Sequence, residues 1–219
     1  AKAHILIATG FHRKPTEKEL RLRFGDDIVD QERIAIHDCT DESMLNKIGL
    51  LSTGLDLKIN RLAFETNLLV AEGFIEPHFF AGFSGRRKSI LPGIAGKESI
   101  MANHSAGFIN SPSSRTGVLK GNPIHNEMVA AASNAKLAFI LNVVLNKDKK
   151  IINAFSGHYN EAHLTGCRFL SEQASVKTKP ADIVISTNGG YPLDQNIYQT
   201  VKSMTAAEAT CRKGGVIIV

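Results

Sequence analysis

Short apolar runs alternate with stretches of helical spacing along most of this chain. Runs of strand length occur at residues 1–8, 33–37, 55–60, 67–75, 136–146 and 150–155. Helical stretches lie between several of them, at residues 16–24, 96–105, 123–135 and 159–176. The charged turn 147–149 separates two consecutive apolar runs, which is typical of an antiparallel hairpin. We therefore expect an α/β fold, with a mixed sheet flanked by helices.

Two of the predicted helices carry recognisable start signals. Thr16 and Glu19 have the spacing of a capping box, in which each side chain accepts a hydrogen bond from the backbone of the other residue. Asn122 is a favourable N-cap, and Pro123 after it suits the first helical position. The sequence therefore predicts that helices begin at these two points.

The end of the chain reads as a second unit. Residues 173–180 are polar and contain a proline, which is typical of a hinge. After them the sequence predicts a strand, a tight loop, a helix and a further strand, at residues 182–186, 188–192, 194–211 and 215–219. We expect one domain over residues 1–172, a hinge over 173–180, and the start of a second α/β domain over 181–219, incomplete because it ends within a strand.

Composition and charge narrow the functional classes. With 219 residues, of which 43% are hydrophobic and 21% charged, the chain can bury a real core. The formal charge of +5 comes mostly from scattered lysines and arginines, and the chain has no tryptophan. No nucleic-acid-binding module is recognisable. These properties argue against nucleic acid and favour a small anionic substrate.

The cysteines and the apolar runs bear on location. Cys39, Cys167 and Cys211 are odd in number and far apart, so they indicate neither a disulfide framework nor a Cys-x-x-Cys metal site. No apolar run approaches the length that spans a bilayer, and no signal peptide opens the chain. We expect a cytoplasmic protein without a membrane partner.

The densest chemistry lies in residues 76–105. His78 and His104 bracket a basic triplet at 86–88, with glycines and prolines in place of apolar periodicity. The strand predicted at 67–75 ends just before His78, where open α/β sheets place ligand crevices. His12 lies between a predicted strand and a predicted helix, another favoured place for a functional side chain. A basic triplet alone is most often a solvated turn, but the two flanking histidines favour a site for an anion or a metal.

Three separated motifs in one order give this stretch a family resemblance. They are ATGFHRKPTEKE near the start, EPHFFAGFSG-x-RK-SI-PGIAGKESI followed by NHS in the middle, and YPLDQNIYQTVK near the end. The chain resembles the nickel-dependent lactate racemase family over essentially its whole length. The resemblance implies racemisation or epimerisation of a 2-hydroxy acid, with lactate first among the substrates. Family members are about twice as long and carry an upstream Asp-x-Thr-Arg-Pro motif, so a truncated, inactive piece is expected.

The resemblance also implies a cofactor and its anchors. The family's cofactor is pyridinium-3,5-bisthiocarboxylic acid mononucleotide, a nickel-pincer nucleotide that accepts a hydride from the substrate. Lys88 matches the lysine covalently attached to the cofactor, and His104 matches the histidine that completes the nickel coordination. Arg87 is expected to border the same crevice as a cofactor-binding residue. Arg86 stands where the family has a glycine, and it would be strained if that position required positive φ.

The remaining site residues follow from the same resemblance. His12 and His78 match the paired acid/base histidines, one for each enantiomer. Gln199 and Lys202 match residues that hold the substrate carboxylate, and their spacing places them on one helical face. We expect His12, His78, Lys88 and His104 to converge on one crevice.

Other interpretations remain open on the residues alone. One is a zinc-dependent hydrolase that uses His12, His78 and His104 as ligands. Another is an inactive fragment that folds and binds only an anion or a metal. The open apolar edge at residues 216–219 also predicts self-association of the second unit. The other histidines are assigned to structure or packing: His4, His37, His125 and His163, the last together with Cys167.

Overall fold

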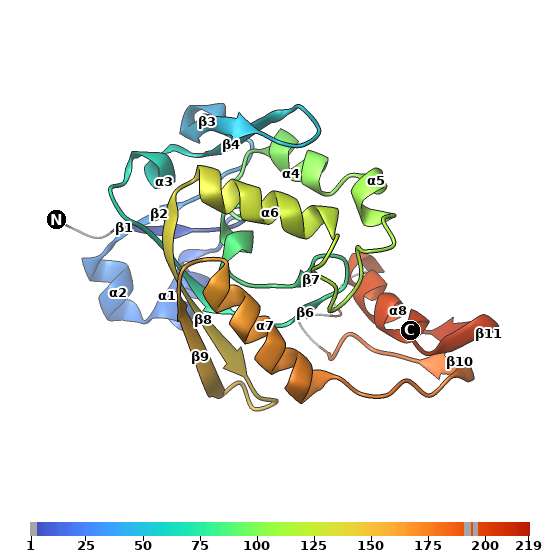
Figure 1. Cartoon of the computed structure of the whole chain (residues 1–219). Coiled ribbons are helices and arrows are strands. Elements are labelled where there is room, and N and C mark those ends of the chain that lie inside the picture. Colours follow the sequence, from blue (N-terminus) through green and yellow to red (C-terminus); the bar gives the residue numbers. More distant parts are fainter. Residues whose placement is uncertain (1–3, 191–193, 195–196) are drawn as a thin grey trace.

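The structure, a computed structural model, describes residues 4–190, 194 and 197–219 (Figure 1). Its first half contains β1 His4–Ile7, α1 Glu17–Phe24, α2 Asp26–Gln31, β2 Arg33–Ile36, η1 Glu42–Met44, β3 Leu45–Leu50, β4 Asp56–Asn60, α3 Arg61–Glu65, β5 Leu69–Phe74, β6 Pro77–His78, β7 Gly82–Phe83, η2 Arg86–Ser89 and α4 Lys97–Asn103. The second half contains α5 Ala106–Ile109, α6 Pro123–Asn134, β8 Leu137–Leu145, β9 Ile151–Gly157, α7 Glu161–Ala174, β10 Ala181–Ile185, η3 Ile197–Gln199, α8 Thr200–Glu208 and β11 Cys211–Ile218. The elements η1, η2 and η3 are short 3-10 helices.

A mixed sheet of three strands lies at the centre of the fold. β5 pairs with β8 in parallel, and β8 pairs with β9 in antiparallel orientation, which confirms the predicted hairpin. α6 and α7 pack against this sheet (Figure 1). β1 and β2 form a separate parallel pair, and β3 and β4 form a separate antiparallel pair. The predicted mixed sheet flanked by helices is therefore confirmed.

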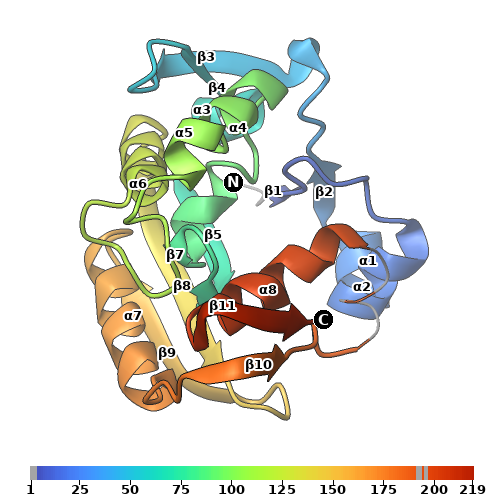
Figure 2. The same ribbon diagram turned by 90° about the vertical axis from the view of Figure 1, so that its right-hand side faces the viewer.

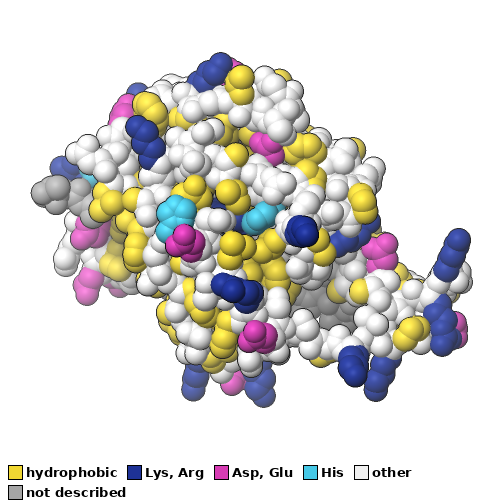
Figure 3. Space-filling model, viewed as in Figure 1, with side chains coloured by type: hydrophobic (Ala, Val, Ile, Leu, Met, Phe, Trp, Pro, Cys, Tyr) yellow, Lys and Arg dark blue, Asp and Glu magenta, His cyan; other side chains and the backbone are white. Residues whose placement is uncertain are grey.

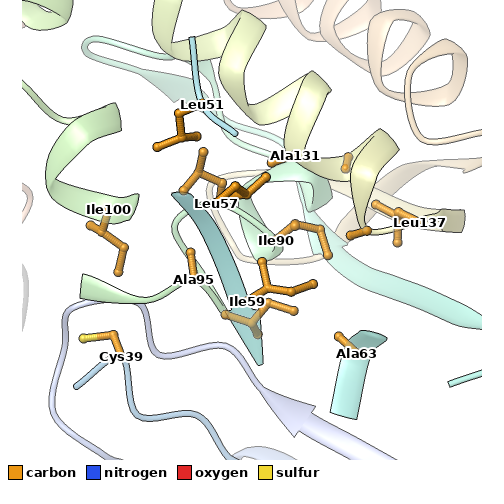
Figure 4. Packing of buried hydrophobic residues seen from close by; sticks show 14 of the residues in the cluster. Cys39, Leu51, Leu57, Ile59, Ala63, Ile90, Ala95, Ile100, Ala131 and Leu137 are labelled. Carbon is orange, nitrogen blue, oxygen red and sulfur yellow. The ribbon is translucent and has the colours of Figure 1, made fainter. Parts of the chain in front are cut away.

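The segment that follows Lys88 is anchored in the main hydrophobic core. Ile90 and Leu91 expose only 1% and 0% of their surface. They belong to one cluster with Ile59 of β4 and Ala131 of α6 (Figure 4). Burying each large apolar side chain contributes about 1.5–3 kcal/mol. The turn that carries Lys88 is therefore tied directly to a well-packed part of the fold.

Both predicted helix starts are confirmed. The Thr16 side chain accepts from the backbone N–H of Glu19, whose carboxylate accepts from the backbone N–H of Thr16 at 2.7 Å. At the start of α6, Asn122 Oδ1 accepts from the backbone N–H groups of Ile124 and His125. These contacts satisfy donors that the helices leave without an internal partner.

Asn122 also ties α6 to the central stretch. The residue is fully buried, and its Nδ2 donates to Phe80 O at 2.8 Å and to Val118 O at 3.0 Å. One side chain therefore caps a helix and satisfies two carbonyls of separate loops. Because every polar atom of the side chain has a partner, its burial costs little.

We expect Asn122→Ala to lower the free energy of unfolding by about 2–4 kcal/mol, from the lost cap and the carbonyls left without donors. Urea unfolding followed by circular dichroism measures this change. Asn126→Ala, at an exposed position of the same helix, is the control and should change stability by less than about 0.5 kcal/mol. Equal effects of the two substitutions would contradict the role assigned to Asn122.

The second unit has a shorter helix than predicted. The sequence pattern places the helix at 194–211 and the last strand at 215–219, but α8 ends at Glu208 and β11 already begins at Cys211. Cys211 pairs with Ala181 at the start of the parallel β10–β11 ladder. Thr210 Oγ1 also donates to Lys179 O at 2.6 Å. These strand contacts draw the chain out of the helix earlier than its composition indicates.

Some predicted segments extend beyond the described residues. They are residues 1–3 of the first strand, 191–192 of the loop in the second unit, and 195–196 of its helix. Within the ranges that the structure describes, no helix combines the length and the apolar character needed to cross a membrane.

The β10–β11 pair exposes apolar side chains. Ile183 and Ile185 of β10 are 64% and 74% exposed, and Val216 of β11 is 55% exposed. Lysine and arginine side chains gather at the same end of the molecule (Figure 3). Self-association through this edge stays a prediction.

Candidate functional site

His78 lies on a tight two-stranded ribbon formed by β6 and β7. Pro77 pairs with Phe83, and His78 pairs with Gly82, in antiparallel orientation. Gly82 has φ of +79°, and a Cβ there would lie 2.3 Å from Val118 O. Only glycine fits this close approach of two backbones. The ribbon therefore holds the His78 ring at a defined place after β5, as expected for a residue near the end of a strand.

Lys88 and His78 are in direct contact. Lys88 Nζ lies 2.6 Å from His78 Nε2, although the residues are ten positions apart. The backbone N–H of Ala81 donates to His78 Nδ1 at 3.2 Å. Because Nδ1 accepts this bond, the proton of the neutral ring lies on Nε2, where it donates to the amine. This arrangement requires the neutral form of Lys88, whose nitrogen has a lone pair.

Burial and neighbouring charges favour the neutral forms of both groups. Burial, followed by the charges of Lys88, His104 and Lys202, lowers the pKa of His78 to about 2. Burial, followed by the charge of Lys202, lowers the pKa of Lys88 to about 8, and Glu76 acts weakly in the opposite direction. Near neutral pH, His78 is therefore an uncharged ring, and about a tenth of Lys88 is an uncharged amine, against less than a thousandth for an ordinary lysine.

His104 presents one free ring nitrogen. It caps the C-terminal end of α4, and its Nδ1 lies 3.2 Å from Ile100 O. Because a carbonyl oxygen only accepts, Nδ1 carries the proton and Nε2 has a lone pair, which is the form that binds a metal. Phe80 packs edge-on to both His104 and His78, with ring centroids 5.1 and 4.6 Å apart. Burial, followed by the charge of Lys88, lowers the pKa of His104 to about 4.

α8 brings residues of the second unit towards the same place. It lies beside the β6–β7 ribbon (Figures 1 and 2), and the charge of Lys202 acts on both His78 and Lys88. Gln199, three residues earlier, has a buried Oε1 without a hydrogen-bond partner among the described residues. Of the two side chains predicted to hold a carboxylate, Gln199 therefore lies at the end of η3, where α8 begins, and Lys202 lies on α8, with its charge acting on His78 and Lys88.

His12 is only partly connected to this group. Its side chain is exposed and lines a cavity of about 220 Å³ together with neighbours of the first two strands. Within the described residues, no hydrogen bond or ring contact joins His12 to His78, Lys88 or His104. Its loop is nevertheless tied to the segment after Lys88, because Gly10 N donates to Gly93 O at 2.8 Å. The pairing of His12 with His78 stays a prediction.

Arg86 is accommodated without backbone strain. It begins the 3-10 helix η2 and is not among the described non-glycine residues with positive φ, which are Lys136 and Lys149. Its backbone N–H donates to Asn142 Oδ1 at 3.2 Å. Its guanidinium occupies the space beside Gly73, where a Cβ would lie 1.0 Å from Nη2. The backbone strain expected at this position is therefore absent, because Arg86 does not have positive φ, and Gly73 leaves room for its longer side chain.

Arg87 faces the interior between α6 and α7. Only 2% of its surface is exposed; its Nη1 lies 2.9 Å from His125 Nδ1, and its Nη2 lies 2.9 Å from His163 Nε2. No acidic side chain within the described residues pairs with it. A direct contact of Arg87 with a cofactor stays a prediction, and the observed geometry supports a structural role.

Sequence analysis missed the partners of Arg87. It assigned His125, His163 and Cys167 to packing, and their burial confirms this, with His163 Nδ1 lying 3.3 Å from Cys167 Sγ. Their contact with a buried guanidinium had no signal in the spacing, because His125 and His163 lie on separate helices. The only local hint was the His-x-x-x-Cys spacing, which places His163 and Cys167 on one face of α7.

A complete metal site is not formed by protein side chains alone in the described part of the chain. No group of three or more His, Cys, Asp or Glu side chains there is arranged to hold a metal ion. The zinc hydrolase interpretation needs three such ligands, so these residues offer it no ligand set. His104 remains as a single candidate ligand.

Comparison with known proteins assigns both ends of the chain to one family. The family model described as "Lactate racemase N-terminal domain" matches residues 1–117. The model described as "Lactate racemase C-terminal domain" matches residues 176–219. The order of these two matches agrees with the order of the two predicted units.

Individual relatives carry the same name. The chain is 61% identical, over 219 residues and 100% of its length, to the lactate racemase of Thermoanaerobacterium thermosaccharolyticum. It is 61% identical over 218 residues to the lactate racemase of Lactiplantibacillus plantarum. It covers 51% of each relative, so it spans about half the length of the curated relatives it matches.

Solved structures show the same fold. The lactate racemase apoprotein from T. thermosaccharolyticum superposes with a TM-score of 0.95, covering 98% of this chain and 51% of that one. A Thermotoga maritima protein of 22% identity superposes with a TM-score of 0.69, covering 85% of this chain and 50% of that one, and shares the fold. Because one domain model covers more than half of the chain, this protein belongs to the lactate racemase family.

Proposed function

We propose that this chain carries part of the active site of a 2-hydroxy acid racemase or epimerase, with lactate as its substrate. The observation that carries this proposal is the contact between Lys88 Nζ and His78 Nε2, 2.6 Å, beside His104 and within the field of Lys202. One region thus contains four groups with separate proposed roles: the amine of Lys88, the base His78, the metal-binding imidazole of His104 and the cation of Lys202 for a carboxylate. The relatives' greater length supports the further proposal that turnover needs segments outside this chain.

His78 is proposed to move the proton of the substrate hydroxyl. A base must be uncharged at the pH of the reaction, and the lowered pKa of His78 meets that requirement. Because the Nε2 proton is directed at Lys88 before attachment, the role of base requires the other tautomer, with the proton on Nδ1, once Lys88 is attached to the cofactor. The two enantiomers present their hydroxyl groups differently, so a second histidine is needed on the other side. We propose His12 for this role, because its loop is tied through Gly10 to the segment after Lys88.

Lys88 and His104 fit the attachment of a nickel-pincer nucleotide. Covalent attachment needs a neutral amine, and the tautomer set by Ala81 requires that form of Lys88. A fourth nickel ligand needs a free imidazole nitrogen, and His104 Nε2 provides one. When bound, this group would supply the acceptor for the hydrogen on the α-carbon of the substrate. The protein supplies the anchor, one ligand and the proton transfer.

Gln199 and Lys202 are proposed to orient the substrate carboxylate. Lys202 provides a positive charge close to the histidines. Gln199 Oε1 is buried and has no partner among the described residues, but an oxygen only accepts, so the group proposed to bond the carboxylate is the Nε2 of the same amide, which donates. Fixing the carboxylate leaves the hydroxyl and the α-carbon directed at His78.

The test uses a full-length protein that carries this sequence, produced together with the biosynthetic pathway of the cofactor. We expect about one nickel ion per chain, a mass increase located on the peptide that contains Lys88, and conversion of one lactate enantiomer into the other. Chiral chromatography, metal analysis and peptide mass spectrometry measure these outcomes. Bound zinc without a mass increase, or an unmodified Lys88 in a racemising enzyme, would contradict the proposal.

A further inference from the structure

We propose that Lys88, before any cofactor is attached, forms an imine with a small 2-oxo acid such as pyruvate. The inference rests on the position of the amine beside His78 and α8, and it gives the apoprotein a covalent chemistry of its own. Only the choice of a 2-oxo acid as the carbonyl compound rests on the proposed function, through the carboxylate site of Gln199 and Lys202. The reactivity of the amine rests on its contact with His78, and its lowered pKa sets the pH range of the test.

The first step concerns the nitrogen itself. Lys88 lies on η2, between a backbone contact of Arg86 to Asn142 and the buried side chains of Ile90 and Leu91. Its long side chain is therefore directed from a fixed backbone. The contact to His78 then holds Nζ at one position and favours its neutral form, because His78 Nε2 donates to it. A desolvated, neutral lysine next to other cations is the form that adds to carbonyl carbon.

The second step concerns access and surroundings. Lys88 and His78 are half-buried, so small molecules reach them while bulk water is limited. The aromatic ring of Phe79 stacks on His78, with centroids 4.9 Å apart, and Phe80 packs edge-on to it. Apolar walls of this kind favour an imine, since its formation releases water.

The third step concerns the ligand. The charge of Lys202 reaches both Lys88 and His78. A carbonyl compound that also has a carboxylate gains from this charge, whereas an uncharged ketone does not. A small 2-oxo acid places its carbonyl carbon next to its carboxylate, so a carbonyl that meets Lys88 brings the carboxylate within the influence of the Lys202 charge.

The reaction balances without any further reagent. The lone pair of Lys88 Nζ adds to the C2 carbonyl carbon, which forms a C–N bond and moves one electron pair to the carbonyl oxygen. His78 gives its Nε2 proton to that oxygen and takes a proton from the nitrogen. Loss of the hydroxyl group together with the second nitrogen proton forms the C=N bond and releases one water. The net change is amine plus 2-oxo acid to imine plus water.

The experiment uses this 219-residue chain without cofactor, incubated with pyruvate and sodium cyanoborohydride, followed by peptide mass spectrometry. We expect reduced pyruvate adducts on Lys88 at least about tenfold faster than on the exposed Lys120, because an ordinary lysine has a pKa near 10.4 and is almost fully protonated at pH 8. The pKa of Lys88, lowered to about 8, predicts that its labelling rises to half of its maximum near that pH. A Lys88 peptide labelled no faster than the Lys120 peptide would overturn the inference.

Two variants and a neutral ketone test the parts of the inference. His78→Gln should slow labelling of Lys88 about tenfold and leave Lys120 unchanged. With acetone as the carbonyl compound, the ratio of Lys88 to Lys120 labelling should be several-fold lower than with pyruvate, and Lys202→Gln should remove this preference. Because the ratio within one spectrum cancels the different reactivity of the two ketones, equal ratios in the unsubstituted chain would overturn the assignment to 2-oxo acids. The ratio needs only the unsubstituted chain, so it remains decisive if a variant fails to fold.

The outcome is separable from that of the proposed racemase function. If the chain forms the imine but the full-length protein never acquires cofactor on Lys88, this inference stands and the racemase proposal fails. If the full-length protein acquires cofactor on Lys88 but the apoprotein gives no pyruvate adduct, the racemase proposal stands and this inference fails.

Discussion

In a full-length protein that carries this sequence, His78→Gln should reduce lactate racemisation by about 10²- to 10⁴-fold and leave covalent cofactor attachment intact. Lys88→Ala should instead abolish attachment and, with it, all racemisation. The difference follows from the two roles proposed for one contact. Lys88 Nζ, which lies 2.6 Å from His78 Nε2, is the proposed anchor, and the His78 ring is the proposed base. Losing the base slows one step, whereas losing the anchor removes the cofactor.

Initial rates with each lactate enantiomer, nickel content and the mass of the Lys88 peptide distinguish these outcomes. His158→Gln is the matched control, because His158 is an exposed histidine between the end of β9 and the start of α7. It should leave both rates and loading unchanged. If His78→Gln lost as much nickel as Lys88→Ala, the separation of anchor and base would be wrong.

Local signals in the sequence were sufficient for several parts of the fold. The capping box of Thr16 and Glu19 and the cap at Asn122 were readable because each involves residues a few positions apart. The hairpin of β8 and β9 was readable for the same reason. Boundaries set by distant partners were not, and β11 began early because Cys211 pairs with Ala181.

The site shows the same division. The spacing of residues 76–105 indicated that chemistry gathers there, and His78 and Lys88 do meet. The neutral state of the amine was not readable, because it depends on which nitrogen of His78 the backbone of Ala81 contacts. Likewise, nothing in the sequence joined Arg87 to His163, 76 positions away on α7, since their side chains meet only when the chain folds.

Lowering the pH from 7.5 to 5 should destabilise this chain strongly, because buried histidines around Arg87 resist protonation. His163 is completely buried and His125 is 8% exposed. Burial, followed by the charge of Arg87, lowers the pKa of His125 to about 4. The same two causes, only partly opposed by Ser84 O, lower the pKa of His163 to about 3. A proton on His163 Nε2 would lie between Ser84 O, 2.8 Å away, which accepts, and the Arg87 guanidinium, 2.9 Å away, which only donates and whose positive charge opposes a second one.

The sign follows from proton binding. Between pH 6.5 and about 4, both histidines take up a proton in the unfolded chain but not in the folded chain. The free energy of unfolding therefore decreases as the pH falls. Stability is therefore full above pH 6.5 and declines below it. Each of the two histidines lowers the free energy of unfolding at pH 5 by about 2 kcal/mol relative to pH 7.5. Their combined effect of about 4 kcal/mol is a large share of the roughly 5–15 kcal/mol by which a typical domain is stable. Carboxylates with lowered pKa, such as Glu19, act only below this range.

Urea unfolding of the unsubstituted chain at pH 7.5, 6.5, 5.8 and 5.0 measures the decline. His163→Gln is the decisive variant, because its amide oxygen still accepts from Arg87 and its side chain does not titrate. It should reduce the loss between pH 7.5 and 5 by about 2 kcal/mol, even if its stability at pH 7.5 is lower. His158→Gln, at an exposed position, should leave the slope unchanged. A pH dependence that is identical in the His163→Gln variant and the unsubstituted chain would show that the histidines around Arg87 are not the groups that resist the proton.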